Sequence, residues 1–165
     1  MKKLCLTSVI TVFLLLYTNG LQAQTTQTKL NQVELMKQFT GTWKSERNDT
    51  TTIIEDNLWG EGHIVYMKTE TKGKVIWEGR TLLGYDKKND MLIEAIIGHN
   101  SPNIFLWSLR FLSSNKFEEV PLDDISNPEK STEKDIYELK TPDLMINTYL
   151  KNNKVVSVDT YKRVK

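Results

Sequence analysis

From residue 41 onward, apolar and polar residues alternate along the chain with a period of two. This alternation predicts β-strands, because successive side chains of a strand point to opposite faces of a sheet. Ten segments carry it, at residues 42–47, 51–56, 63–69, 75–83, 91–98, 104–111, 116–120, 135–140, 144–150 and 155–164. Most are joined by short polar turns such as Gly60-Glu61-Gly62 and Lys72-Gly73. We therefore predict an all-β fold, an antiparallel meander of about ten strands that forms a β-barrel, with a sandwich as the alternative.

Two segments depart from this pattern. Leu30, Val33 and Met36 fall at helical spacing, which predicts a short helix over residues 31–39. We expect this helix to cap an open barrel end; packing against the outside of the barrel is the alternative. Residues 121–134 form the one long, polar connection, and we expect it to be a mobile flap.

The alternation also assigns side chains to the inner face of the barrel. In the central strands we expect Trp77 with Val75, Gly79, Thr81 and Leu83; Ile93 with Met91, Ala95 and Ile97; and Phe105 with Trp107, Leu109 and Phe111. These aromatic residues either fill a solid core or line a ligand cavity, and a ten-stranded barrel is wide enough to leave a cavity. The predicted ligand-binding residues are Tyr66, Trp77, Ile93, Phe105, Trp107 and His99.

Gly41-Thr42-Trp43 lies where the strand pattern begins. Glycine permits a close backbone approach, and a buried indole provides a large apolar surface together with one N–H that needs a partner. We expect Trp43 to be a structural plug at one barrel end rather than a ligand contact.

The first residues resemble a secretory signal peptide. Lys2 and Lys3 precede an apolar run over residues 4–17, and Ala23 offers a small residue for cleavage. The expected organisation is a signal peptide at 1–23, a leader and short helix at 24–40, and a barrel domain at 41–165. This predicts a periplasmic or secreted protein without a stable membrane span after cleavage. Cys5 is the only cysteine, so the mature chain would have no disulfide.

Charge and motifs exclude several function classes. Loss of Lys2 and Lys3 from the 22 basic residues, with all 21 acidic residues kept, gives a net charge of about −1, which argues against a nucleic-acid partner. No zinc-ligand spacing, nucleotide-binding glycine motif or G-x-S-x-G is present, so no catalytic or metal-binding residues are predicted. The acidic residues between Glu118 and Glu129 lack calcium-loop spacing and are expected to be solvated.

Three islands resemble a lipocalin-like family of the calycin group. They are Gly41-Thr42-Trp43, the nine residues Glu78-Gly79-Arg80-Thr81-Leu82-Leu83-Gly84-Tyr85-Asp86, and Thr160-Tyr161-Lys162-Arg163. The resemblance implies a calycin barrel in which Arg163 packs across Trp43, and it implies binding of a small apolar molecule. Within the second island, Gly84 is expected to permit the turn after Leu83.

No cofactor is predicted, although haem is weighed as an alternative. In the nitrobindins, which are calycin-like barrels, haem is held by a histidine near the C-terminal strands, and here no histidine follows His99. Haem held by His63 or His99 therefore stays a minor alternative.

Three function classes remain open. The first is a binding protein for a small apolar molecule. The second is an enzyme on a barrel scaffold, an isomerase or hydrolase, which predicts an inward carboxylate or His99 deep in the cavity. The third is a protein-binding module that uses the 121–134 loop.

Overall fold

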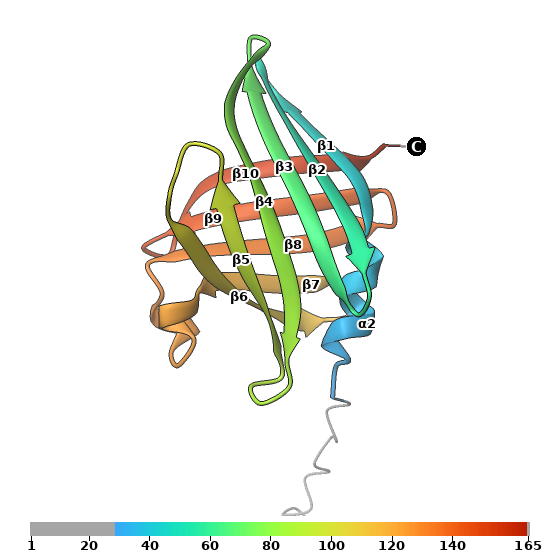
Figure 1. Cartoon of the computed structure of the whole chain (residues 1–165), viewed down its shortest axis with the longest axis vertical. Helices are drawn as coiled ribbons and strands as arrows, with labels where there is room; N and C mark the ends of the chain where they lie inside the picture. Colours follow the sequence, from blue (N-terminus) through green and yellow to red (C-terminus); the bar gives the residue numbers. More distant parts are fainter. Residues whose placement is uncertain (1–28, 165) are drawn as a thin grey trace, which may run out of the picture.

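A computed structural model describes residues 29–164, which form a closed antiparallel β-barrel of ten strands (Figure 1). Each strand pairs with its neighbours in sequence, and β1 pairs with β10 to close the barrel. The strands are β1 (Gly41–Arg47), β2 (Thr50–Trp59), β3 (Gly62–Thr71), β4 (Lys74–Asp86), β5 (Met91–Gly98), β6 (Ile104–Ser113), β7 (Lys116–Pro121), β8 (Glu133–Thr141), β9 (Leu144–Lys151) and β10 (Lys154–Arg163). The predicted ten-stranded meander is confirmed, and the sandwich alternative is wrong.

A short helix covers one end of the barrel, as the sequence predicts. It comprises α2 (Gln32–Met36) and the 3-10 turn η1 (Lys37–Phe39), and Asn31 caps it by accepting a hydrogen bond from the N–H of Glu34 at 3.1 Å. The buried Gln32 side chain accepts a hydrogen bond from the N–H of Phe111 at 2.8 Å. This bond fixes the helix to β6, so the barrel is closed at what we call the helix end.

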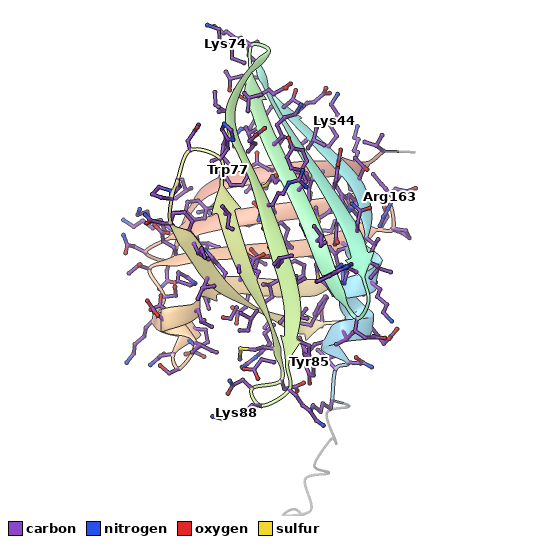
Figure 2. The ribbon with its side chains drawn as sticks, in the orientation of Figure 1. Lys44, Lys74, Trp77, Tyr85, Lys88 and Arg163 are labelled. Carbon is purple, nitrogen blue, oxygen red and sulfur yellow. The ribbon has the colours of Figure 1, made fainter. Side chains whose placement is uncertain are left out.

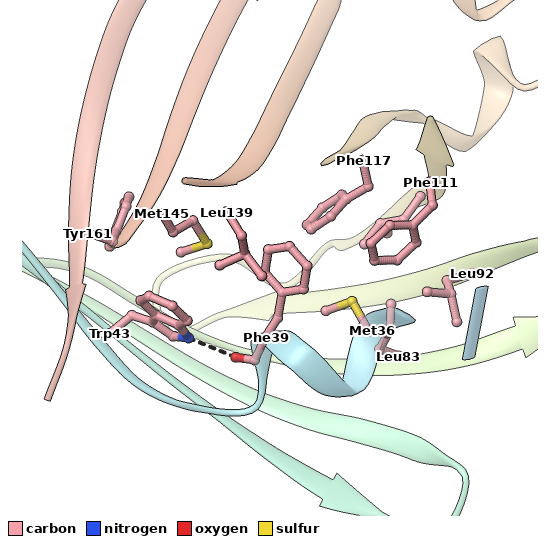
Figure 3. Packing of buried hydrophobic residues seen from close by; sticks show 11 residues of the cluster. Met36, Phe39, Trp43, Leu83, Leu92, Phe111, Phe117, Leu139, Met145 and Tyr161 are labelled. Atoms are coloured by element: carbon pink, nitrogen blue, oxygen red, sulfur yellow. Dashed lines mark hydrogen bonds between the residues drawn. The ribbon is translucent and has the colours of Figure 1, made fainter. Parts of the chain in front are cut away.

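A hydrophobic cluster fills the barrel beneath this helix (Figure 3). The rings of Phe39, Phe111 and Phe117 meet at centroid distances between 4.9 and 5.9 Å, and Tyr137 stacks on Phe117 at 4.9 Å. Such aromatic pairs stabilise a core beyond the area that they bury. The core is therefore packed at the helix end.

The other end of the barrel is formed by five connections. Because the strands alternate in direction, the β1–β2, β3–β4, β5–β6, β7–β8 and β9–β10 connections all lie away from the helix. We call this end the mouth. The β7–β8 connection contains two 3-10 turns, η2 (Leu122–Asp124) and η3 (Pro128–Lys130). Ile125 and Pro128 lie against Met91 and Val120 on the outside of the barrel, and the buried Ser131 hydroxyl donates to Asp124 at 2.6 Å.

One predicted turn is wrong. Strand β4 does not end at Leu83 but continues through Gly84, which pairs with Ile93, to Asp86. Asp86 then organises the turn itself, because its carboxylate accepts hydrogen bonds from the N–H of Lys88 at 2.9 Å and the side-chain amide of Asn89 at 2.6 Å. The predicted signal peptide at 1–23 lies outside the described residues.

Candidate ligand-binding cavity

The barrel encloses a cavity of about 420 Å³ between the packed helix end and the mouth. Small-molecule sites in proteins commonly measure about 300–1,000 Å³. One wall is apolar and aromatic, and it is formed by strands β3 to β6. Its residues are Val65, Met67, Trp77, Ile96, Phe105 and Trp107.

The aromatic residues of this wall lie at different depths. Phe105 borders the cavity while 47% of it is exposed, which places it at the mouth. Figure 2 shows Trp77 in the half of β4 far from the helix, with Tyr85 and Lys88 at the helix end. Trp107 is two residues further along β6 from the mouth than Phe105. A molecule entering the barrel would therefore meet Phe105 first.

A second region of the lining, which we call the acidic wall, carries carboxyl groups from β5, β7 and β8. Glu119 of β7 and Asp135 of β8 are direct partners across the strand pair, and both line the cavity. Glu94 of β5 also lines it and is only 9% exposed. Asp135 accepts a hydrogen bond from the Asn147 amide at 2.9 Å. Within residues 29–164, the carboxyl groups of Glu94 and Glu119 have no hydrogen-bond or ion-pair partner.

Burial and mutual repulsion disfavour the ionised forms of these three acids. Burial, with the added charge of Asp135, raises the pKa of Glu94 to about 8. Burial, followed by the charges of Glu94 and Asp135, raises the pKa of Glu119 well above its ordinary value. Burial also raises the pKa of Asp135, although the Asn147 hydrogen bond opposes the shift. The cavity therefore holds carboxyl groups that keep protons near neutral pH.

The floor of the cavity is the plug that the sequence predicts at Trp43 (Figure 3). Trp43 is 1% exposed, and its Nε1–H donates to the carbonyl of Phe39 at 2.7 Å. The Arg163 guanidinium lies 4.1 Å from the Trp43 ring centroid and donates to the carbonyls of Gln38, Thr40 and Pro142. Trp43 also borders the cavity, which the expectation of a purely structural plug does not include.

The backbone at position 41, two residues before this tryptophan, requires a glycine. Its φ is +125°, and a Cβ there would lie 2.7 Å from Nη1 of Arg163. The glycine therefore makes room for the arginine that covers Trp43.

Of the predicted ligand-binding residues, the structure brings Trp77, Phe105 and Trp107 together around the cavity. Ile93 is not among them, and the face assigned to β5 is wrong. Thr81 and Leu83 on the inner face of β4 pair with Ile96 and Glu94, so the inner residues of β5 are the even-numbered ones. Met91 is buried too, but beneath the β7–β8 connection on the outside.

Tyr66 and His99 meet outside the cavity. The Tyr66 hydroxyl donates to Glu78 at 3.2 Å, and the Arg80 guanidinium lies 5.1 Å from the Tyr66 ring centroid. His99 is 68% exposed, and its Nδ1 lies 3.4 Å from the same Glu78 carboxylate. The expectation that these two residues line the cavity is wrong, because Tyr66 alternates with the inward Val65 and Met67 of β3.

His63 is buried in a pair with Asp56. It is 2% exposed, and its Nδ1 lies 2.7 Å from Oδ1 of Asp56, which borders the cavity. Neither histidine is placed as an axial haem ligand in the cavity, since neither His63 nor His99 lines it. Among residues 29–164, no three histidine, cysteine, aspartate or glutamate side chains are arranged to hold a metal ion.

Sequence reasoning missed the acidic wall. The expectation that the acidic residues between Glu118 and Glu129 are solvated is wrong for Glu119, which faces the cavity. Glu118 forms a salt bridge of 3.2 Å with Lys134, in which its side chain is only 17% exposed. A signal was present, because Glu119 is two residues after Phe117 in β7 and therefore lies on the same, inward face of the strand. In the described part of the chain, no helix is long and apolar enough to cross a membrane. No family model, curated protein or solved structure matches the chain.

Proposed function

We propose that this protein is an extracytoplasmic, lipocalin-like binding protein that holds a small, largely apolar molecule inside its barrel. The observation that carries the proposal is the cavity of about 420 Å³ with Trp77, Phe105 and Trp107 on one wall. Aromatic walls inside a closed barrel are typical of sites for compact apolar molecules. The secretory signal and the calycin resemblance remain sequence-based support for the compartment and the class.

The matched pair Ile96 and Ile97 allows a direct test. Ile96 lines the cavity, whereas its neighbour Ile97 points outward and is 54% exposed. The uncharged dye N-phenyl-1-naphthylamine should bind the parent protein with saturation and with increased dye emission. Ile96→Trp should reduce this binding by tenfold or more by filling the cavity, while Ile97→Trp should leave it unchanged. Equal binding by both variants would place the dye on the outer surface and overturn the proposal.

An enzyme that transfers a proton, such as an isomerase, is a second candidate. It is favoured by Glu94, a deep inward carboxyl whose pKa is raised to about 8, near the range useful for general acid–base chemistry. The test is to incubate the protein in D₂O with a small-molecule extract of its source and measure deuterium uptake by mass spectrometry. Uptake that the parent catalyses and Glu94→Gln does not would support the enzyme; uptake equal to that without protein would exclude it for the extracted compounds.

A further inference from the structure

Three carboxyl groups line the cavity beside its aromatic residues. Glu119 and Asp135 are direct cross-strand partners, and Glu94 is the cross-strand partner of Trp107. All four residues line the same cavity. Glu94 is nine-tenths buried, and its carboxyl group has no hydrogen-bond or ion-pair partner within residues 29–164.

This arrangement does not serve the stability of the barrel. Like charges placed directly opposite each other on a sheet destabilise it, and a buried carboxylate without a partner is costly. An apolar side chain such as those at Ile96 or Leu109 would fill the same wall without that cost. The carboxyl groups are more readily explained by a ligand that supplies their partner.

The surrounding charged groups do not supply that partner. The titratable groups that share the cavity with the three acids or act on them include Glu133 and Tyr137 of β8, Tyr149 of β9, and Asp159 and Tyr161 of β10. Asp56 of β2 also lines the cavity, where it is paired with His63. The nearby basic groups are already paired, Lys151 with Glu133 at 2.9 Å and Arg47 with Asp159 at 3.3 Å. Among residues 29–164, no lysine, arginine or histidine side chain lines the cavity.

We propose that the molecule bound in the barrel carries a positively charged nitrogen on an apolar body, and that Glu94 and Glu119 bind this nitrogen beside the Trp107 indole. The inference rests on the proposed binding function and specifies its ligand class. An organic cation fits this lining, because the indole face attracts a cation and the remaining apolar residues pack against its body. A bare metal ion fits less well, since the acids of residues 29–164 are not arranged to coordinate one.

The test compares two probes of nearly identical shape. Benzyltrimethylammonium has a permanent positive charge, and neopentylbenzene is its uncharged carbon analogue. Binding of each is followed by the emission of the cavity tryptophans in a Trp59→Phe background, which removes a tryptophan that is 67% exposed. Parent protein at pH 9, where Glu94 is ionised, should bind the cation at least tenfold more tightly than the neutral probe.

Variants assign that preference to the carboxyl groups. The double variant Glu94→Gln/Glu119→Gln should lose the preference for the cation and keep binding of neopentylbenzene. The matched control Glu55→Gln, at an exposed position of β2, should retain the preference. Because benzyltrimethylammonium has no proton to lose, its affinity should increase from pH 6 to pH 9 as the carboxyl groups ionise.

Each contrary result overturns a different claim, so the results can be told apart. Equal binding of the two probes by the parent overturns the cation inference while the proposed binding function stands. A preference that survives in the double variant overturns the role of the two glutamates. A cation affinity that falls as pH rises shows that the acids act as protonated donors to neutral ligands and also overturns the inference. Failure of both probes to bind counts against the cavity as a ligand site, and thus against the proposed function itself.

Discussion

Gly79 leaves the space that the Trp77 indole occupies on the inner face of β4. A Cβ at Gly79 would lie 2.6 Å from Cη2 of Trp77 and 3.0 Å from the carbonyl oxygen of Ile97. Real Cβ atoms do not approach other atoms this closely, so a side chain here would displace the indole or the strand. The glycine of the Glu78-Gly79 pair therefore positions one of the aromatic residues of the cavity wall.

Gly79→Ala should move Trp77 and change the cavity. We expect a loss of about 1–3 kcal/mol in the free energy of unfolding, as for other overpacked sites, together with weaker dye binding. The matched control is Gly84→Ala in the same strand, where an added Cβ meets nothing within 4 Å. Urea unfolding and dye titration measure both effects. If the two variants have the same stability and affinity, Gly79 does not seat the indole.

Trp43 should contribute more to stability than any other tryptophan. Trp43→Ala removes a side chain that is 1% exposed, so we expect a loss of about 3–5 kcal/mol. Arg163→Ala should cost less, through lost packing and hydrogen bonds over the indole. Trp59→Ala is the control, because Trp59 is 67% exposed and its loss should change stability by about 0.5 kcal/mol or less. Thermal or urea unfolding compares the three; a Trp43→Ala protein as stable as its parent contradicts the plug.

Trp107 should matter for binding in a way that Trp59 does not. Trp107 lines the cavity, whereas Trp59 ends β2 at the helix end of the barrel. Trp107→Ala should weaken binding of N-phenyl-1-naphthylamine by about tenfold, since it removes aromatic contact area worth about 0.5–1.5 kcal/mol beyond simple burial. Trp59→Ala should bind the dye as the parent does. Equal weakening in the two variants would show that the dye does not occupy the barrel.

The strand order and most of the aromatic wall could be predicted from the sequence, because alternation and turn residues are local signals. The inner face of β5 could not, since this strand is apolar at both Ile93 and Ile96 and alternation alone does not choose between them. The register of β4 with β5 decides the choice, and it brings Glu94 inward opposite Leu83. A rule that charged residues face solvent therefore gives the wrong answer at the position that defines the acidic wall.

The same dependence on strand register explains why the predictions for Tyr66 and His99 are wrong. A tyrosine and a histidine near a cavity-forming strand are reasonable ligand contacts by residue type. The parity of β3 and the length of the β5–β6 connection instead bring both to Glu78 on the outer surface. The residue types of Tyr66 and His99 suggest ligand contacts, but the strand register places both side chains on the outside of the barrel.

The acidic wall makes stability depend on pH in a direction opposite to that of an ordinary paired carboxylate. The pKa of Glu94 is about 8 in the folded protein against 4.5 for an unperturbed glutamate. Between these values the folded state keeps a proton that the unfolded chain has released, so stability falls as pH rises. The slope for one such group is about 1.4 kcal/mol per pH unit, and its contribution levels off above about pH 8.

Glu94→Gln should remove this contribution, because the amide has the shape of the protonated acid and does not ionise. The variant should match its parent near pH 4.5 and be more stable at pH 8 to 9, with the gap opening between these values. Some decline with pH should persist, because burial raises the pKa of Glu119 and Asp135 in the same direction. Urea unfolding at half-unit pH steps measures the gap, with Glu55→Gln at its exposed site as the control that should follow the parent. Parallel curves for parent and Glu94→Gln would mean that Glu94 is solvated and ionised at neutral pH, and the unpartnered buried carboxyl that supports the cation inference would then be lost.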